Sequence, residues 1–141
     1  MSTTGSGRFE SRQCAVQILY ALNIPPAGQP PNDAENHIAD FWRHFGGSND
    51  ARPFADELVR GVLTAMPRVD ERLQKASTNW RLDRMARIDL AILRLAVYEL
   101  SESVGVPREV AIDQAVELAK LFSTQESARF INGVLAGVVS G

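Results

Sequence analysis

Residues 82–138 carry a near-unbroken helical pattern, and its closing phrase, FINGVL at residues 130–135, constrains the fold most. Asn and Gly are each less favourable than Ala in a helix by roughly 0.5–1 kcal/mol, so an apolar helix keeps them for a reason. One reason is close helix packing over Gly133, with Asn132 satisfying a buried backbone group. The other is an accessible polar notch beside Phe130 that receives a ligand or a base. The sequence leaves both open.

The segment 83–101 predicts the central helix of a bundle. At about 100° per residue its apolar side chains occupy most of the circumference, and Asp83, Arg87 and Arg94 share a narrow polar strip. A helix that is apolar nearly all round is buried. Further helices are predicted at residues 9–22, 33–45, 50–66, 67–77, 107–122 and from 123 onward. No alternating strand pattern occurs, so we expect an all-α, single-domain helical bundle of about seven helices.

Several boundaries follow from local composition. Residues 1–8 are mostly small and polar and predict a flexible N-terminal arm, and residues 23–32 predict a Pro/Gly-rich linker. Pro67 is expected to begin a new helix. Ser123 and Glu126 have the spacing of a capping box, in which Ser123 accepts from the following turn and Glu126 reaches back.

Composition excludes several classes of function. The net charge of −2 predicts no general attraction to phosphate, so nucleic acid must be met through a local patch or with a partner. Cys14 is the single cysteine, and His37 and His44 have no third ligand at helical spacing, so neither a disulfide nor a metal site is expected. No catalytic motif or phosphate loop occurs, which predicts a protein that is not an enzyme and needs no cofactor. Without a leader or an apolar run of roughly 20 residues, we expect a cytoplasmic protein.

Four phrases resemble the family of the bacterial transcription antitermination factor NusB. They are RQCAVQILY at residues 12–20, RLAVYEL at 94–100, VPREVAIDQAVELAK at 106–120 and FINGVL at 130–135. Because they follow the family's order from its first helix to its last, the resemblance covers most of the chain. Residues 25–52 show no family phrase.

The resemblance implies a small all-helical adaptor. Such proteins pair with NusE, a small-subunit ribosomal protein, and together they bind the single-stranded boxA element of nascent RNA. In a complex with RNA polymerase and other Nus factors they promote read-through of terminators, chiefly in ribosomal RNA operons. Single-stranded RNA is recognised by stacking, base hydrogen bonds and a few phosphate contacts, none of which needs a strongly basic protein.

The resemblance also implies site residues. Its RNA contacts fall on Arg8, Arg12, Tyr20, Asp89, Glu126 and Phe130. The arginines are expected to meet phosphate, the two aromatic residues to stack on bases, and the central-helix carboxylate to accept from a base amine. The protein-partner surface falls on Asp83, Arg84 and Asp89.

Simpler interpretations stand beside these. Tyr20 and Phe130 fit core positions equally well, and the two arginines fit solvated charges at a helix start. Buried carboxylates need partners, so Glu99 is expected in an internal ion pair, whereas Asp89 is expected at the surface where RNA and partner meet.

One departure from the family bears on function. Better-known members open with a run of arginines, whereas Phe9, Glu10 and Ser11 separate Arg8 from Arg12 here. Each lost phosphate contact reduces, by about one unit, the slope of the logarithm of the binding constant against the logarithm of the salt concentration. We therefore expect weak binding to RNA alone and strong dependence on NusE. Two other classes stay open. One is a protein-interaction module or homodimer without strong RNA binding. The other is a NusB-like domain of a ribosomal RNA cytosine methyltransferase. Such an enzyme would continue into a cofactor-binding α/β domain, which we do not expect here because the sequence ends at Gly141.

Overall fold

Six α-helices and two short 3₁₀ turns form the described part of this computed structural model, residues 4–102 and 105–140. In chain order they are α1 (Thr4–Leu22), α2 (Ala34–His44), η1 (Asn49–Ala51), α3 (Arg52–Ala76), η2 (Leu82–Arg84), α4 (Arg87–Ser101), α5 (Arg108–Phe122) and α6 (Gln125–Ser140). No strand occurs within those ranges, which confirms the all-α class. None of the helices there combines the length and the apolar character that a membrane crossing needs.

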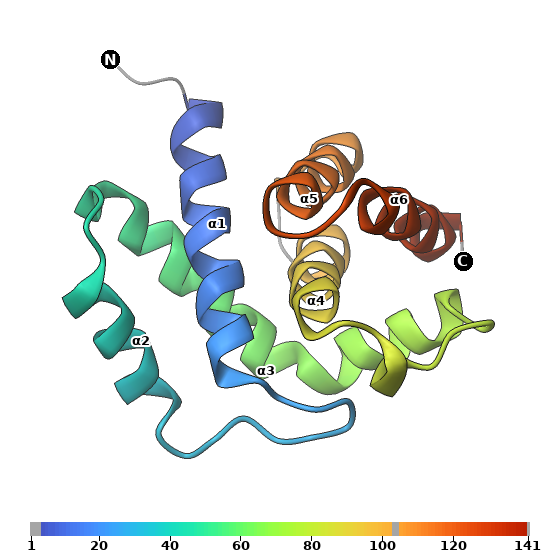
Figure 1. Ribbon diagram of the computed structural model, residues 1–141, viewed down its shortest axis with the longest axis horizontal. Helices are drawn as coiled ribbons and strands as arrows, with labels where there is room; N and C mark the ends of the chain where they lie inside the picture. The colour runs from blue at the N-terminus through green and yellow to red at the C-terminus, as the bar shows by residue number, and fades with distance from the viewer. Residues whose placement is uncertain (1–3, 103–104, 141) are drawn as a thin grey trace.

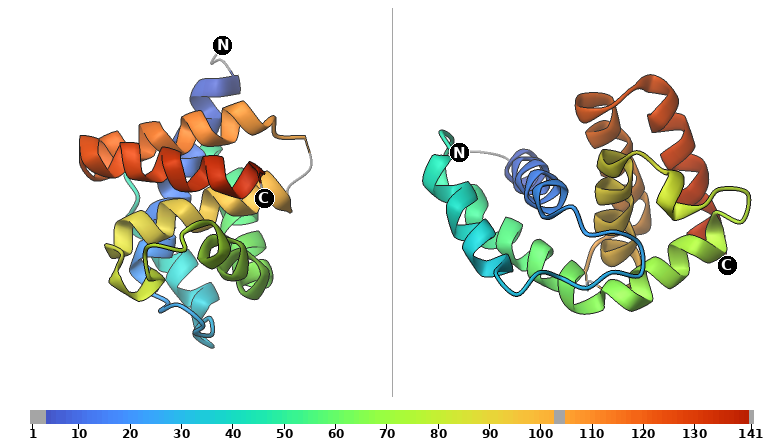
Figure 2. Two further views of the ribbon diagram at one scale, coloured as in Figure 1. Left: turned by 90° about the vertical axis from the view of Figure 1, so that its right-hand side faces the viewer. Right: turned by 60° about the horizontal axis from the view of Figure 1, so that its bottom comes forward.

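Helix α4 is the central helix, as its sequence predicts. It lies between α1 and the α5–α6 pair, with α3 passing beneath (Figures 1 and 2), and it packs against all four. Ten of its fifteen residues are buried. Leu93 and Leu95 are among its fully buried side chains, and each such leucine contributes about 1.5–3 kcal/mol through its burial.

Helix α3 corrects the prediction of two helices that meet at Pro67. It is one helix of 25 residues that continues through the proline. An interior proline costs about 3 kcal/mol because it removes a hydrogen bond and clashes with the preceding turn. Apolar residues on both sides of it, Val62, Met66, Val69 and Leu73, are buried in the same core. This packing on both halves of the helix offsets the local cost.

The helix starts differ from their predicted positions. α1 begins at Thr4, so residues 4–8 of the expected arm are helical, and residues 1–3 lie outside the described part. α4 begins at Arg87, because residues 82–84 form the separate turn η2. The expected total of about seven helices is close to the six α-helices within the described ranges, and the difference arises because the two helices expected on either side of Pro67 are the single helix α3.

The linker at 23–32 is irregular, as predicted, and an ion pair ties it to the core. Arg94 donates from Nε to Asp70 Oδ1 and from Nη2 to Asp70 Oδ2, both at 2.9 Å. The same guanidinium donates from Nη1 to Ile24 O at 2.7 Å and from Nη2 to Pro25 O at 3.2 Å. Arg94 thus pairs a buried carboxylate and satisfies two linker carbonyls, which compensates the burial of its charge.

Candidate nucleic-acid interface

The first turns of α4 and α6 are joined by a chain of hydrogen bonds. Thr124 Oγ1 accepts from the Ser127 backbone N–H at 2.9 Å, so Thr124 caps α6 in place of the predicted Ser123. Ser123 Oγ donates to Ser127 Oγ at 2.9 Å, and Ser127 Oγ donates to Asp89 Oδ2 at 3.0 Å. Asp89 is in the first turn of α4, where the helix dipole favours a negative charge.

Asp89 is buried and only half paired. Its exposed fraction is 7%, so the expectation of a carboxylate at the open surface is wrong. Oδ1 is buried with no hydrogen-bond partner among the described residues, while Oδ2 accepts from Ser127. A buried acceptor without a partner is costly, and a donor supplied by a bound molecule would remove that cost. The predicted acceptor role of Asp89 toward a base therefore remains a prediction with a geometric basis.

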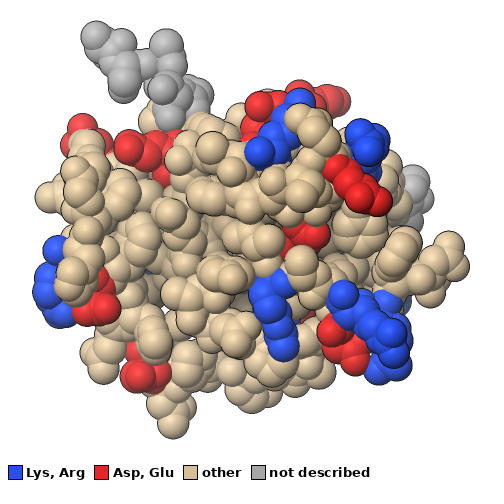
Figure 3. All heavy atoms as spheres, viewed as in Figure 1, with Lys and Arg blue, Asp and Glu red and all other residues tan. Residues whose placement is uncertain are grey.

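A local basic patch lies on the segment before and at the start of α4. Arg81, Arg84 and Arg87 face a single acid, Asp83, so three positive charges against one give this segment +2, although the whole chain carries −2. Asp83 pairs with Arg81 at 2.7 Å, while Arg84 and Arg87 are exposed. Figure 3 shows blue side chains gathered at the lower right, over the η2 segment of Figure 1. The expected partner contacts of Asp83 and Arg84 stay predictions, and both side chains are accessible.

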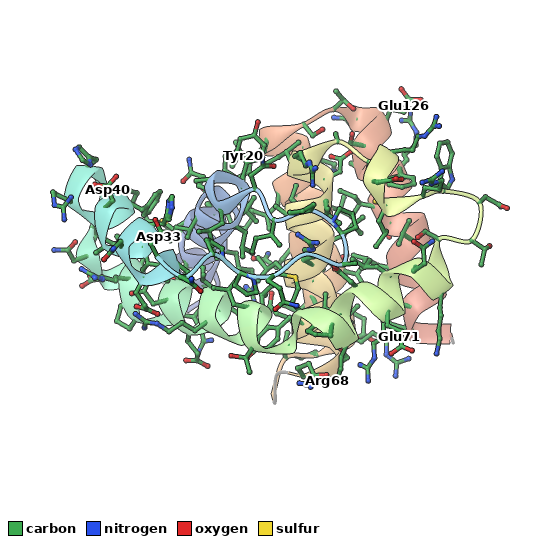
Figure 4. All side chains as sticks on the ribbon, turned by 90° about the horizontal axis from the view of Figure 1, so that it is seen from below. Tyr20, Asp33, Asp40, Arg68, Glu71 and Glu126 are labelled. Carbon is green, nitrogen blue, oxygen red and sulfur yellow. The ribbon has the colours of Figure 1, made fainter. Side chains whose placement is uncertain are left out.

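Tyr20 lies on this same face. Its side chain is 51% exposed, so its interpretation as a core residue is wrong. It lines a small pocket together with Arg87, which places the tyrosine beside the start of α4. Figure 4 shows Tyr20 and Glu126 on one side of the molecule, and Arg68 and Glu71 on the opposite side. The structure thus brings Tyr20 and Glu126 to a common face, and their contact with RNA stays a prediction.

Phe130 shares its surroundings with an aromatic residue that the sequence analysis missed. Phe130 is half-buried and packs on the core, and its ring meets Trp80 edge to face at 5.5 Å. Trp80 is 59% exposed. The two rings, with Arg129 and Gly133, border a groove of about 290 Å³. The signal for Trp80 was its place in a polar segment, between Asn79 and Arg81, where a buried aromatic residue is not expected.

The two arginines of α1 have different surroundings. Arg12 is 4% exposed, and its Nε and Nη2 donate to the two carboxylate oxygens of Glu99, each at 2.8 Å. Nη1 donates to Gln114 Oε1 at 3.1 Å. This confirms the internal ion pair of Glu99 and contradicts both the phosphate contact and the solvated charge expected of Arg12. Arg8 is exposed, with its guanidinium 3.9 Å from the centroid of the Phe54 ring, and remains available to phosphate.

The remaining reactive side chains do not form a site. Cys14 is buried, and burial, followed by the nearby carboxylates of Glu10 and Asp56, raises the pKa of its thiol to about 11. A neutral buried thiol packs as a small apolar residue. Within the described ranges no three His, Cys, Asp or Glu side chains gather in a way that suits a metal ion.

Comparison with known proteins places the chain in a family. A profile of the NusB family matches residues 10–140. The chain belongs to the NusB family. The transcription antitermination protein NusB of Sorangium cellulosum is 45% identical to it over 91% of this chain and 88% of that protein. That of Bacillus velezensis is 40% identical over 93% of this chain and 94% of that protein.

Solved structures of the NusB family share the fold. The NusB protein of T. maritima has a TM-score of 0.76 and 25% identity, covering 99% of this chain and 93% of that one. A crystal structure of the antitermination factors NusB and NusE in complex with dsRNA contains a chain with a TM-score of 0.74 and 20% identity, covering 96% of this chain and 97% of that chain. The family profile and the curated relatives confirm the family resemblance drawn from the sequence.

Proposed function

We propose that this NusB-family chain is a transcription antitermination factor. It binds boxA-type single-stranded RNA together with NusE and promotes read-through by RNA polymerase in a complex with other Nus factors. The observation that carries the proposal is the open acceptor of Asp89, set beside a basic segment and exposed aromatic rings. The names of the curated relatives and the related NusB–NusE complex with RNA support the same role.

Each kind of side chain on this face suits one part of single-stranded RNA. Arg87 supplies a phosphate contact on this face, and Arg8 supplies another from the start of α1. Tyr20 and Phe130 supply faces for base stacking, and Asp89 Oδ1 accepts from a base N–H. These contacts need no bond making or breaking. We therefore propose that the chain acts by binding alone, without a cofactor. We also propose that it acts in the cytoplasm.

Dependence on NusE follows from the loss of Arg12 as a phosphate ligand. Since the Arg12 guanidinium is engaged by Glu99 and Gln114, Arg8 is the one basic side chain that α1 offers in its first half. Fewer phosphate contacts mean a smaller electrostatic contribution to affinity. NusE then supplies the missing contacts, with Asp83 and Arg84 as its proposed docking residues.

The test is a titration of labelled boxA-type RNA, followed by fluorescence anisotropy, with and without NusE and at two salt concentrations. A scrambled RNA of equal length is the control. We expect selective binding that NusE strengthens. If boxA and scrambled RNA bind equally in both conditions, the RNA role is wrong, and light scattering then shows whether a homodimer covers this face.

A further inference from the structure

We propose that the groove bordered by Trp80, Phe130 and Gly133 holds one unpaired RNA base, with Trp80 as its outer stacking wall. The inference rests on the proposed RNA-binding function and adds a site to it. Stacking on an aromatic face tolerates any base, because every base presents a π-surface. The groove thus extends the RNA path from the start of α4 along the side of α6.

Trp80 is held in place although its ring is exposed. Its backbone N–H donates to Ser77 O at 2.9 Å, and Ser77 Oγ donates to Leu73 O at 2.6 Å at the end of α3. A T-shaped contact with Phe130, with the ring planes at 76°, fixes the indole further. A 59% exposed tryptophan that is ordered in this way presents a preformed surface, so a base that stacks on it orders few new groups.

Gly133 keeps the groove open. A Cβ at Gly133 would meet no atom within 4 Å, so close packing, one of the two explanations for this glycine, is wrong. Glycine in a helix interior costs about 1 kcal/mol of stability relative to alanine, and no close packing contact at Gly133 offsets this cost. An open groove beside two aromatic rings supplies the reason, because a large side chain at this position would occupy the space of the base.

Charge favours RNA over a protein side chain as the occupant. Arg129 borders the groove, is exposed and has no ion-pair partner among the described residues. Arg81 follows Trp80 directly, and the segment that continues to Arg87 carries the net charge of +2. A base in the groove would bring its own phosphate beside these guanidinium groups, where it gains a favourable contact.

The size of the groove suits a single base. Its volume of about 290 Å³ lies at the lower limit of pockets for small molecules, which hold about 300–1,000 Å³. One side is closed by the end of α3 and the other by α6, through Ala76 and Val134.

The test uses the full chain with NusE and boxA-type RNA, and compares Trp80→Ala and Gly133→Leu with matched controls. Leu121→Ala removes another exposed apolar side chain, and Gly46→Leu enlarges another glycine with open space around it. We expect the two groove variants to lose about 5- to 150-fold in affinity, which is the range of one stacked base. Trp80→Phe should retain most of the binding, and the controls should bind as the unaltered chain does.

Tryptophan fluorescence gives a second readout. Trp42 is 6% exposed, so quenching by RNA reports on Trp80 and should vanish in Trp80→Phe. If the unaltered chain binds boxA RNA and the groove variants match their controls, this inference is overturned while the proposed function stands. If the unaltered chain fails to bind, the function fails. If the groove variants lose NusE in the absence of RNA, the groove holds a protein side chain and the inference is again overturned.

Discussion

Each end of α4 carries a buried carboxylate, and the two carboxylates differ in how fully they are hydrogen-bonded. Glu99, near the C-terminal end, is 2% exposed and receives two guanidinium hydrogen bonds at 2.8 Å from Arg12. Asp89, near the N-terminal end, is 7% exposed and has one oxygen without a partner in the described structure. The Glu99 carboxylate has a hydrogen bond on both oxygens within the chain, whereas the Asp89 carboxylate can accept a further hydrogen bond at Oδ1. Under the proposed function, this buried helix contributes to stability at one end and to RNA binding at the other.

The surroundings of the two ends differ in the same direction. Gly61 of α3 contacts Tyr98 next to Glu99, and a Cβ at that glycine would collide with the tyrosine ring and hydroxyl. On the Asp89 side, Gly133 faces open space, and Trp80 and Tyr20 are exposed. Tight packing therefore surrounds Glu99 and Tyr98, whereas exposed aromatic rings and a basic segment lie near Asp89.

The largest effect is expected from removing the partner of Glu99. Arg12→Met leaves a buried carboxylate uncompensated, which should lower the free energy of unfolding by about 3–5 kcal/mol. Urea denaturation measures it. Arg60→Ala, which breaks the exposed pair with Glu35, is the control and should cost about 1 kcal/mol or less. The double variant Arg12→Met, Glu99→Leu should recover much of the loss. A loss for Arg12→Met no greater than that of the control would show that this pair does not stabilise the Glu99 end of α4.

Alanine at the two glycines sharpens the contrast. Gly61→Ala forces Tyr98 to move and should lower the free energy of unfolding by about 1–3 kcal/mol. Gly133→Ala adds a methyl group to open space in a helix and should leave it unchanged or raise it by up to about 1 kcal/mol. Thermal and urea unfolding of both variants test this. Equal destabilisation by both would contradict the open character of the α6 side.

Neutralising Asp89 should affect binding more than stability. Asp89→Asn keeps an oxygen for Ser127 and removes a half-paired buried charge, so the free energy of unfolding should change by about 1 kcal/mol or less. Affinity for boxA-type RNA with NusE should fall about tenfold, the loss of one charge-assisted hydrogen bond. Asp40→Asn on α2, an exposed position, is the control for titration and unfolding alike. A large loss of stability with unchanged affinity would make Asp89 a structural residue like Glu99.

The smallest effect concerns Cys14, two residues from Arg12. Its raised pKa, about 11 against an ordinary 9.0, means that the neutral thiol is favoured by folding. This contribution is fully present below pH 9.0 and is lost as the pH rises through about 11. We expect Ellman's reagent to react slowly with the folded protein at pH 8 and rapidly after denaturation. Rapid reaction in the folded state would show that this part of the core is open.

Sequence periodicity predicted the helices well and their junctions less well. Residues 83–101 indicated the buried helix because apolar side chains occupy most of its circumference and must be covered by other helices on several sides. Pro67 misled the prediction, since burial on both sides of a proline outweighs a local rule. The η2 turn and the α6 cap at Thr124 depend on hydrogen bonds that local patterns only approximate.

The candidate site was less predictable because it depends on pairing between distant residues. Glu99 was expected in an ion pair, but nothing local to residue 12 showed that Arg12 is its partner, 87 positions away. Arg12 therefore retained the phosphate role that the family resemblance implied. The burial of Asp89 depends on α6, and the groove at Trp80 depends on the packing of α6 against the end of α3. Such contacts appear only once the helices are assembled.

Hydrogen–deuterium exchange of the chain alone, and then with NusE and boxA-type RNA, tests most directly whether the two ends of α4 have different roles. The account predicts new protection in residues 78–90 and 124–130, near Asp89, and little change around Arg12 and Glu99. New protection confined to α2 or to the C-terminal end of α4, with residues 78–90 unchanged, would contradict it.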